Sequence, residues 1–212
     1  MTPVSDKSRT IRTFCSTAPV IPVLVVNDPA RPLADALVAG GLPVLEVTLR
    51  TPAALDCIRA MATSDGIVGA GTVLTADDVK AAAAAGAKFA VSPGATDALV
   101  DAAERTGLPL LPGVATASEV MYLLERGYTV QKFFPAEAAG GVAALKGFYG
   151  PLPQVSFCPT GGISPANVGA YLSLPNVVCV GGSWVAPADA IASANWQSIE
   201  KLARESAALT AA

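Results

Sequence analysis

The stretch VLEVTLRTPAALDCIRAMATSDGIVGAG, residues 44–71, contains two apolar runs separated by a segment long enough for one helix. The first run, VLEVTL from residue 44, and the second, IVGAG from residue 67, have the composition of buried strands. Between them, Thr51–Pro52 is typical of a helix N-cap followed by proline at the first helical position. The stretch therefore predicts a strand, a helix and a second strand.

The same unit recurs along the whole chain. Similar apolar runs begin at residues 20, 44, 67, 89, 110, 129, 155 and 177, so that successive strands leave room for one helix and two loops. Eight regular βα units predict an α/β fold, a (β/α)8 TIM barrel in a single domain over residues 1–212. An open doubly wound sheet is the alternative. Residues 4–17 are predicted to form a short extra N-terminal helix at the bottom of the barrel, and the region after Trp196 the eighth helix.

Helix start and stop signals fall where this repeat needs them. Thr75–Asp78 and Thr116–Glu119 have the spacing of a capping box, and Ser164–Pro165 repeats the pattern of an N-cap with proline after it. Glycines are expected to end helices just before the next strand, at positions 40, 41, 86, 107 and 127.

The composition excludes several classes of function. With 52% hydrophobic and only 15% charged residues, the chain can form a large core and has apolar surface to spare for subunit contacts. Its longest apolar stretch, residues 18–26, is too short to cross a bilayer, and the first residues do not resemble a secretory signal. A net charge of −3 without any run of basic residues offers no footprint for nucleic acid. We therefore expect a cytoplasmic protein with no membrane or nucleic-acid partner.

The sequence lacks histidine, which is both the commonest metal ligand and the commonest general base. Its cysteines, at positions 15, 57, 158 and 179, contain no C-x-x-C pair and are typical of reduced core thiols. We expect no metal and no cofactor, and proton transfer must use a carboxylate, lysine, tyrosine or water.

Two charged residues are predicted to point into the barrel from its second strand. Glu46, Thr48 and Arg50 alternate along that strand, so they share a face, and with Val44 this face is the interior. A charge inside the barrel needs an opposite charge or a ligand to offset its desolvation. One interpretation is a structural ion pair between Glu46 and Arg50, and the other is a substrate site at the carboxyl ends of the strands.

The stretch VQKFFPAE, residues 130–137, places a lysine inside the barrel in the same way. Lys132 and Phe134 share one face of the sixth strand, where burial and a nearby Arg50 would disfavour the ammonium form. A neutral lysine amine is a nucleophile toward ketones and forms a Schiff base. The alternative is a lysine whose ammonium group reaches solvent at the end of the strand.

Glycine-rich segments follow the last two predicted strands, CPTGGIS at residues 158–164 and VGGSW at residues 180–184. Barrels often bind phosphate here, through backbone N–H groups backed by a helix N-terminus, and the candidates are Gly161, Gly162, Gly182 and Ser183. The alternative is that these glycines only allow tight packing. Small residues in GAGT (69–72) and SPG (92–94) leave space for a ligand beside Thr72. Together these features predict a site for a small phosphorylated keto compound.

The motifs LEVTLRT, GAGTVL, SPG, KFFPAE, CPTGGIS and GGSW occur in an order and spacing that closely resemble the 2-keto-3-deoxy-6-phosphogluconate (KDPG) aldolase family. Members of this family are class I aldolases of the Entner–Doudoroff pathway, and many also accept 4-hydroxy-2-oxoglutarate (KHG). The resemblance extends over nearly the whole chain. It implies reversible cleavage of KDPG to pyruvate and glyceraldehyde 3-phosphate, with no metal or organic cofactor and a homotrimeric assembly.

The resemblance also assigns roles to individual residues. Lys132 would form the Schiff base and Glu46 would be the general acid and base. The other residues would bind the substrate: Arg50 and Thr72 its carboxylate end, Thr160, Phe134 and Pro93 the keto acid and the cavity wall, and Gly161, Gly162, Gly182 and Ser183 its phosphate. Gln131 and Ser156 depart from the family pattern, but alternation directs Gln131 away from Lys132.

Two other interpretations remain open from the sequence. An aldolase with the same site could prefer KHG, the galactonate epimer of KDPG, or oxaloacetate. A non-catalytic barrel could bind a sugar phosphate as a sensor, although such a protein would have no need for both Lys132 and Glu46.

Overall fold

The computed structural model describes residues 7–28 and 31–209. Within them the strands are β1 (Val20–Leu24), β2 (Val44–Thr48), β3 (Ile67–Gly71), β4 (Ala90–Val91), β5 (Leu110–Leu111), β6 (Gly113–Val114), β7 (Val130–Phe133), β8 (Ser156–Pro159) and β9 (Val180–Gly182). The helices are α1 (Arg9–Cys15), α2 (Arg31–Ala39), α3 (Ala54–Met61), α4 (Ala76–Ala84), α5 (Asp97–Thr106), α6 (Ala117–Glu125), α7 (Gly141–Tyr149), α8 (Val168–Leu172), α9 (Ala188–Ala192) and α10 (Trp196–Ala207). No helix in these ranges is long and apolar enough to cross a membrane.

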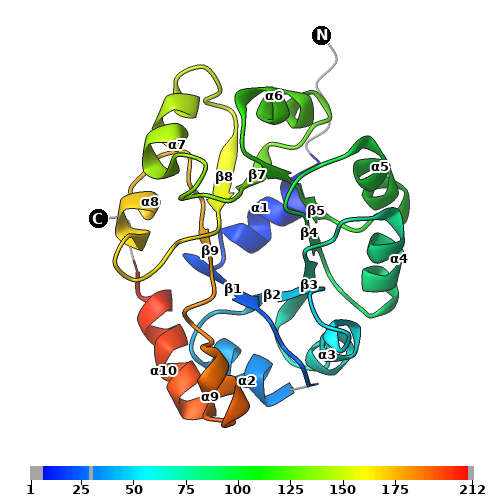
Figure 1. The fold of residues 1–212 in the computed structure, drawn as a ribbon, viewed down its shortest axis with the longest axis vertical. Helices are drawn as coiled ribbons and strands as arrows, with labels where there is room; N and C mark the ends of the chain where they lie inside the picture. Colours follow the sequence, from blue (N-terminus) through cyan, green and yellow to red (C-terminus); the bar gives the residue numbers. More distant parts are fainter. Residues whose placement is uncertain (1–6, 29–30, 210–212) are drawn as a thin grey trace.

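The strands form a curled parallel sheet with helices α2 to α10 outside it (Figure 1), which confirms the predicted α/β fold. Six strands pair in the order β5-β4-β3-β2-β1-β9 and three in the order β6-β7-β8. Parallel bridges join Phe157 to Val177 and Thr160 to Gly181, between the β8 and β9 segments. Each of the eight predicted apolar runs contains a strand, but the fifth is divided at Pro112 into β5 and β6. Proline has no N–H to donate to a neighbouring strand, so it interrupts the ladder at this point.

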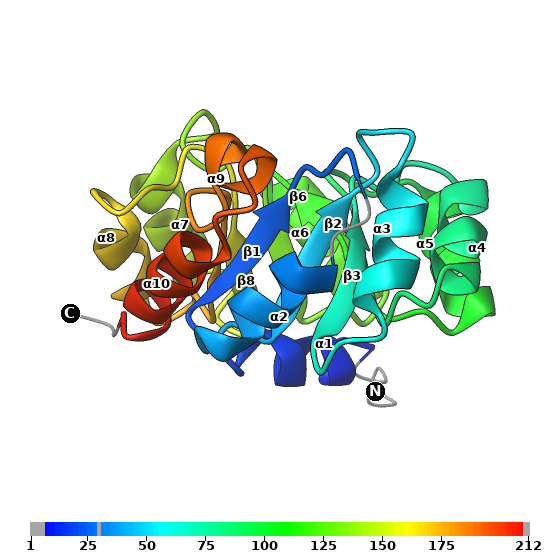
Figure 2. The ribbon, with the colours of Figure 1, turned by 90° about the horizontal axis from the view of Figure 1, so that it is seen from below.

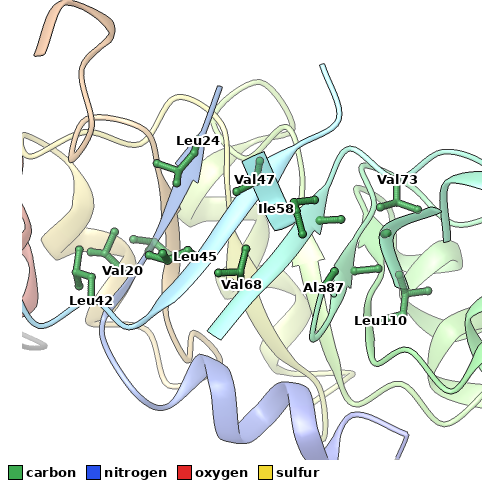
Figure 3. Close-up of a cluster of buried hydrophobic side chains, with 14 of the residues drawn as sticks. Val20, Leu24, Leu42, Leu45, Val47, Ile58, Val68, Val73, Ala87 and Leu110 are labelled. Carbon is green, nitrogen blue, oxygen red and sulfur yellow. The ribbon is translucent and has the colours of Figure 1, made fainter. Parts of the chain in front are cut away.

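Alternate residues of each strand pack on two different layers. Outward-facing side chains such as Leu45, Val47 and Val68 lie in a large apolar cluster between the sheet and its helices (Figure 3). Because β2 is buried along its whole length, the intervening residues Val44 and Glu46 must face the interior. The packing thus directs an acidic side chain into the middle of the fold.

The interior at the amino ends of the strands is a second apolar cluster, which includes Phe89, Val91, Leu111 and Val130. Helix α1 lies across this end of the sheet (Figure 2) and contributes Ile11 and Cys15 to the cluster. Two further cysteines, Cys158 and Cys179, belong to the same cluster, and all are free thiols.

Polar contacts fix α1 in this place. Ser8 Oγ accepts a hydrogen bond from Val130 N at 3.0 Å, and Arg12 donates to Ser156 Oγ at 3.1 Å and to Thr129 Oγ1 at 3.0 Å. The prediction of an extra N-terminal helix is confirmed for Arg9–Cys15, and residues 4–6 of the predicted segment lie outside the described residues. Ser156 therefore serves as a partner for α1 at the closed end of the interior.

Candidate active site

Lys132 points into the interior from the third position of β7. Its Nζ lies 3.2 Å from Glu46 Oε1, and the residue is 5% exposed. Its neighbour Gln131 points outward, where its amide donates to Val120 O at 3.2 Å and Tyr128 O at 2.9 Å. Strand alternation is confirmed for both residues, and the alternative of a solvent-exposed Lys132 is wrong.

Glu46 reaches Lys132 because the adjacent strand β3 has glycines on its interior face. Gly69 lies opposite Glu46 in the parallel register, and Gly71 follows two residues later. A Cβ atom on Gly71 would lie 2.5 Å from Glu46 Cγ and would overlap its carboxylate. Glycine at this position therefore leaves the space that the carboxylate occupies.

Arg50 does not pair with Glu46. It lies beyond the end of β2 and is exposed, and its Nε donates to Thr72 Oγ1 at 3.2 Å. Thr72 follows β3 with a φ of 56°, a left-handed conformation that is unusual for a residue other than glycine. The structural ion pair considered between Glu46 and Arg50 is therefore wrong. Instead, the Arg50 guanidinium is hydrogen-bonded to the Thr72 hydroxyl at the carboxyl ends of β2 and β3.

Phe134 and Thr160 follow the ends of the paired strands β7 and β8, next to the lysine. Lys132 Nζ is 5.4 Å from the centroid of the Phe134 ring, as expected from the shared strand face. Thr160 follows β8 and is 7% exposed, and its hydroxyl has no hydrogen-bond partner among the described residues. A side chain on Gly181 would overlap that hydroxyl. Thr160 thus has an unused donor and acceptor close to the strand that carries Lys132.

The half-buried Pro93 follows β4 and packs against β6. A Cβ atom on Gly113 would overlap its backbone, so Gly113 allows the two segments to approach. Gly113 in turn lies opposite Lys132 in the parallel register. Pro93 is therefore one strand away from the lysine, at the same end of the sheet.

The two glycine-rich loops differ in why they need glycine. Gly161 and Gly162 have φ values of 101° and 79°, which only glycine adopts without strain. Gly182 has no such φ, but the indole of Trp184 covers the position where its side chain would be. Tight packing, the alternative considered for these glycines, is thus observed at Gly182.

Open N–H groups are present in both loops. Within residues 31–209, the backbone N–H groups of Gly162, Ile163 and Ser183 donate to no other protein group. A helix follows each loop, α8 from Val168 and α9 from Ala188, so a few residues separate each glycine-rich loop from the helix after it.

Two contacts near the site were not predicted, that of Gly71 with Glu46 and that of Glu137 with Tyr171. Glu137 ends the KFFPAE motif and accepts a hydrogen bond from the Tyr171 hydroxyl. The signal for Gly71 was available in the alternation of GAG along β3, since Gly69 and Gly71 share the interior face with Glu46. No comparable signal connects Glu137 with a tyrosine 34 residues further along the chain.

A buried amine beside a carboxylate, with a guanidinium and open backbone donors at the same end of the sheet, is equipped for Schiff-base chemistry on an anionic ketone. Among the described residues, no three acidic or cysteine side chains are grouped so as to hold a metal ion. A family model for KDPG and KHG aldolase matches residues 11–202. The chain belongs to the KDPG and KHG aldolase family.

Relatives within the KDPG and KHG aldolase family match most of the chain. The 2-dehydro-3-deoxy-phosphogluconate aldolase of Pseudoalteromonas atlantica is 56% identical over 197 residues, which cover 91% of this chain and 92% of the relative. The crystal structure of KDPG aldolase from Legionella pneumophila, with pyruvate captured at low pH as a covalent carbinolamine intermediate, is 48% identical with a TM-score of 0.90. It matches 93% of this chain and 98% of the Legionella chain.

A second aldolase structure of the family contains a phosphorylated ligand. The 2-keto-3-deoxy-6-phosphogluconate aldolase of Zymomonas mobilis ZM4, solved with 3-phosphoglycerate, is 49% identical with a TM-score of 0.90. The match covers 96% of this chain and 98% of the Zymomonas chain.

Proposed function

We propose that this protein is a carbon–carbon lyase that cleaves KDPG reversibly to pyruvate and glyceraldehyde 3-phosphate through a Schiff base on Lys132. The observation that carries this proposal is the 3.2 Å contact between the buried Lys132 Nζ and Glu46 Oε1. The pyruvate carbinolamine in the Legionella relative and the name of the Pseudoalteromonas relative support the same chemistry and substrate.

The reaction begins when the Lys132 amine attacks the C2 ketone. A C–N bond forms, the ketone oxygen gains a proton, and a carbinolamine results. Glu46 is close enough to take up a proton from Lys132 and to deliver one to the leaving hydroxyl group. Loss of water then gives an iminium, which is a sink for electrons.

Carbon–carbon cleavage follows from the same two groups. Glu46 takes the proton of the C4 hydroxyl, the C3–C4 bond breaks, and its electron pair moves into the iminium to form an enamine. Glyceraldehyde 3-phosphate leaves. Glu46 then returns the proton to C3, and hydrolysis of the imine releases pyruvate and regenerates Lys132.

The remaining predicted residues orient the substrate in this proposal. Arg50, held by Thr72, would pair with the substrate carboxylate. Thr160 would use its unpartnered hydroxyl on the keto acid, with Phe134 and Pro93 as apolar walls. The phosphate would accept hydrogen bonds from the loops that contain Gly161, Gly162, Gly182 and Ser183, where open N–H groups support this assignment.

We further infer that the chain is one domain and that its strands form a closed (β/α)8 barrel. Support comes from the bridges between β8 and β9 and from the single residue that separates β5 from β6. The alternative of an open sheet would leave β8 and β9 unpaired.

A cytoplasmic homotrimer is the form in which we propose that the enzyme acts. Exposed apolar side chains such as Leu74 and Met121 and the 15% charged fraction support subunit contacts. Sedimentation equilibrium tests the assembly, since a trimer has three times the chain mass of 21.3 kDa. Fractionation of the source cells tests the location.

Borohydride trapping with pyruvate tests the mechanism. Reduction should fix pyruvate on Lys132, as located by peptide mass mapping, and Lys132→Ala should abolish both trapping and turnover. Glu46→Gln should still be trapped but should turn over KDPG about 10²-fold or more slowly, the loss expected for a general acid–base group. An adduct on a different lysine, or full activity of Glu46→Gln, would contradict the assignment.

Rates on four substrates test the substrate assignment. We expect the highest kcat/KM on KDPG, compared with KHG, the galactonate epimer of KDPG and oxaloacetate. A clear preference for one of the other three would identify an aldolase with the same site and a different substrate.

A further inference from the structure

The loop after β7 and the loop after β8 are joined at Glu137. Its backbone N–H donates to Gly161 O at 3.1 Å, and the adjacent Ala136 N–H donates to Thr160 O at 2.8 Å. The side chain of Glu137 also covers Gly162, where an added Cβ atom would lie 2.6 Å from Glu137 Cγ. Glu137 thus touches both glycines whose left-handed conformation shapes the loop.

Tyr171 in α8 holds the Glu137 carboxylate from the other side. Its hydroxyl donates to Glu137 Oε1, although the tyrosine itself is fully buried. Gly141 lets the two groups meet, because a Cβ atom there would lie 3.1 Å from the Tyr171 hydroxyl and 3.4 Å from Glu137 Oε1. Burial and the hydrogen bond to Glu137 both raise the pKa of Tyr171, so it remains a donor throughout the neutral range.

This carboxylate is in an unexpected place. It lies against Gly162, whose N–H group is open to bind an anion, and a negative charge there opposes the binding of phosphate. Electrostatics alone would therefore favour a neutral or basic residue at position 137. The contacts of Glu137 with Gly161, Gly162 and Tyr171 instead indicate that the residue is needed for the shape of the loop.

We propose that Glu137, held by Tyr171, is a positioning residue that fixes the Gly161–Gly162 loop and so determines the preference for phosphorylated over unphosphorylated keto acids. This role rests on the proposed function, because the substrate phosphate must bind at that loop. In the described part of the chain, neither Glu137 nor Tyr171 forms a hydrogen bond or ion pair with Lys132 or Glu46, so we expect the chemical steps on pyruvate to be independent of the pair.

Kinetics on two substrates distinguish a role of Glu137 and Tyr171 in positioning the phosphate loop from a general role in stabilising the fold. KDPG carries a phosphate and KHG does not, while both would form the same imine on Lys132. Glu137→Ala and Tyr171→Phe should each raise the KM for KDPG about tenfold, the order expected when one positioning hydrogen bond is lost. The KM for KHG and the kcat values should change less than about twofold, within the effect of a neutral contact.

A conservative variant and a matched control complete the experiment. Glu137→Gln keeps the acceptor for Tyr171 and the contact with Gly162, so it should bind KDPG at least as tightly as the parent enzyme. Tyr149→Phe removes a tyrosine hydroxyl from the exposed end of α7 and should leave both KM values unchanged. Thermal unfolding of each variant checks that it is folded.

Equal effects on KDPG and KHG, or no effect of Glu137→Ala and Tyr171→Phe on either KM, would overturn the positioning role. Loss of KDPG affinity in Glu137→Gln as large as that in Glu137→Ala would also overturn it, since the shape is retained there. Failure of the proposed function would be seen earlier, in the parent enzyme, as no turnover of KDPG or no pyruvate adduct on Lys132. The two failures are therefore distinguishable.

Discussion

The placement of Glu46 depends on an absent side chain. Gly71 provides the space for its carboxylate, because a Cβ atom at this position of β3 would overlap the Glu46 side chain. In the proposed mechanism, Glu46 must stay within hydrogen-bond distance of Lys132 to transfer protons, so Gly71 is as important to that geometry as either charged residue.

Gly71→Ala is predicted to lower kcat about 10²-fold, because the added methyl group displaces Glu46 and removes acid–base catalysis. Borohydride trapping of pyruvate should persist, since the three atoms nearest the new methyl group all belong to Glu46 and Lys132 keeps its amine. Gly147→Ala is the matched control, because Gly147 lies in α7 with open space where its side chain would be. Unchanged kcat in Gly71→Ala would show that Glu46 tolerates displacement.

For single residues, the sequence predicted which side chains face the interior but not which hydrogen-bond partners they have. Alternation was sufficient for Glu46, Lys132 and Phe134 because all three lie on or next to regular strands. Arg50 lies two residues beyond the end of β2, in a turn where alternation no longer applies. Its pairing with Thr72 could not be predicted for that reason.

Helix starts and stops agreed with the sequence signals where a side chain caps the free backbone groups at the start of the helix or a glycine ends it. The capping boxes predicted at Thr75–Asp78 and Thr116–Glu119 are both confirmed, at the start of α4 and of α6. The glycine stops are also confirmed, as in the left-handed C-cap at Gly107.

The two predictions of an N-cap before proline were wrong, because the same residues form turns. Thr51 Oγ1 donates to Val26 O at 2.5 Å, and α3 begins only at Ala54. At Ser164, the backbone N–H donates to Asn167 Oδ1 at 2.8 Å, and α8 begins at Val168. A serine or threonine before proline suits a turn as well as a helix start, so sequence alone does not separate them.

The capping box of α6 predicts a pH-dependent contribution to stability. Burial by itself raises the pKa of Glu119, but hydrogen bonds from the backbone N–H groups of Ala115 and Thr116 and from the Thr116 hydroxyl outweigh it and lower the pKa. The stabilisation is therefore present above the ordinary glutamate pKa of about 4.3 and is lost as the pH falls through the lowered value.

For Glu119→Gln, urea unfolding at several pH values should show the largest loss of stability near neutral pH and a smaller loss below about pH 4. Glu125→Gln, in the last turn of the same helix, controls for the removal of one exposed negative charge. A loss for Glu119→Gln that is the same at every pH would contradict the assigned cause.

Across the whole molecule, the interior differs in composition between the amino ends and the carboxyl ends of the strands. The amino ends of the strands are covered by α1 (Figure 2) and filled by apolar side chains. The carboxyl ends hold the charged groups. Regular spacing of the apolar runs was enough to predict the strands and the outer helices. The division of β5 from β6 and the short helix α9 were not predicted, because each spans only a few residues and has no periodic pattern.

Separation of the two ends predicts that stability and activity respond to different substitutions. Ile11→Ala should lower the free energy of unfolding by about 2 to 5 kcal/mol, because it leaves a cavity in the buried cluster beneath α1. The kcat on KDPG should not change. Thr13→Ala, on the exposed face of α1, is the control for both measurements. A large fall in kcat for folded Ile11→Ala would show that the two ends are coupled.

The buried cysteines can serve as probes of local unfolding, because each becomes reactive only when the structure around it opens. Hydrogen bonds with Cys15 and Cys158, together with burial, raise the pKa of Cys179, so this thiol is protected from alkylation in the closed state. Cys57 lies instead on the buried face of α3, in the apolar layer between the sheet and its helices, where burial raises its pKa too. Mass spectrometry after brief alkylation would therefore measure two separate opening rates in one chain. The alkylation rate of Cys179 would report release of α1, and that of Cys57 detachment of the outer helices.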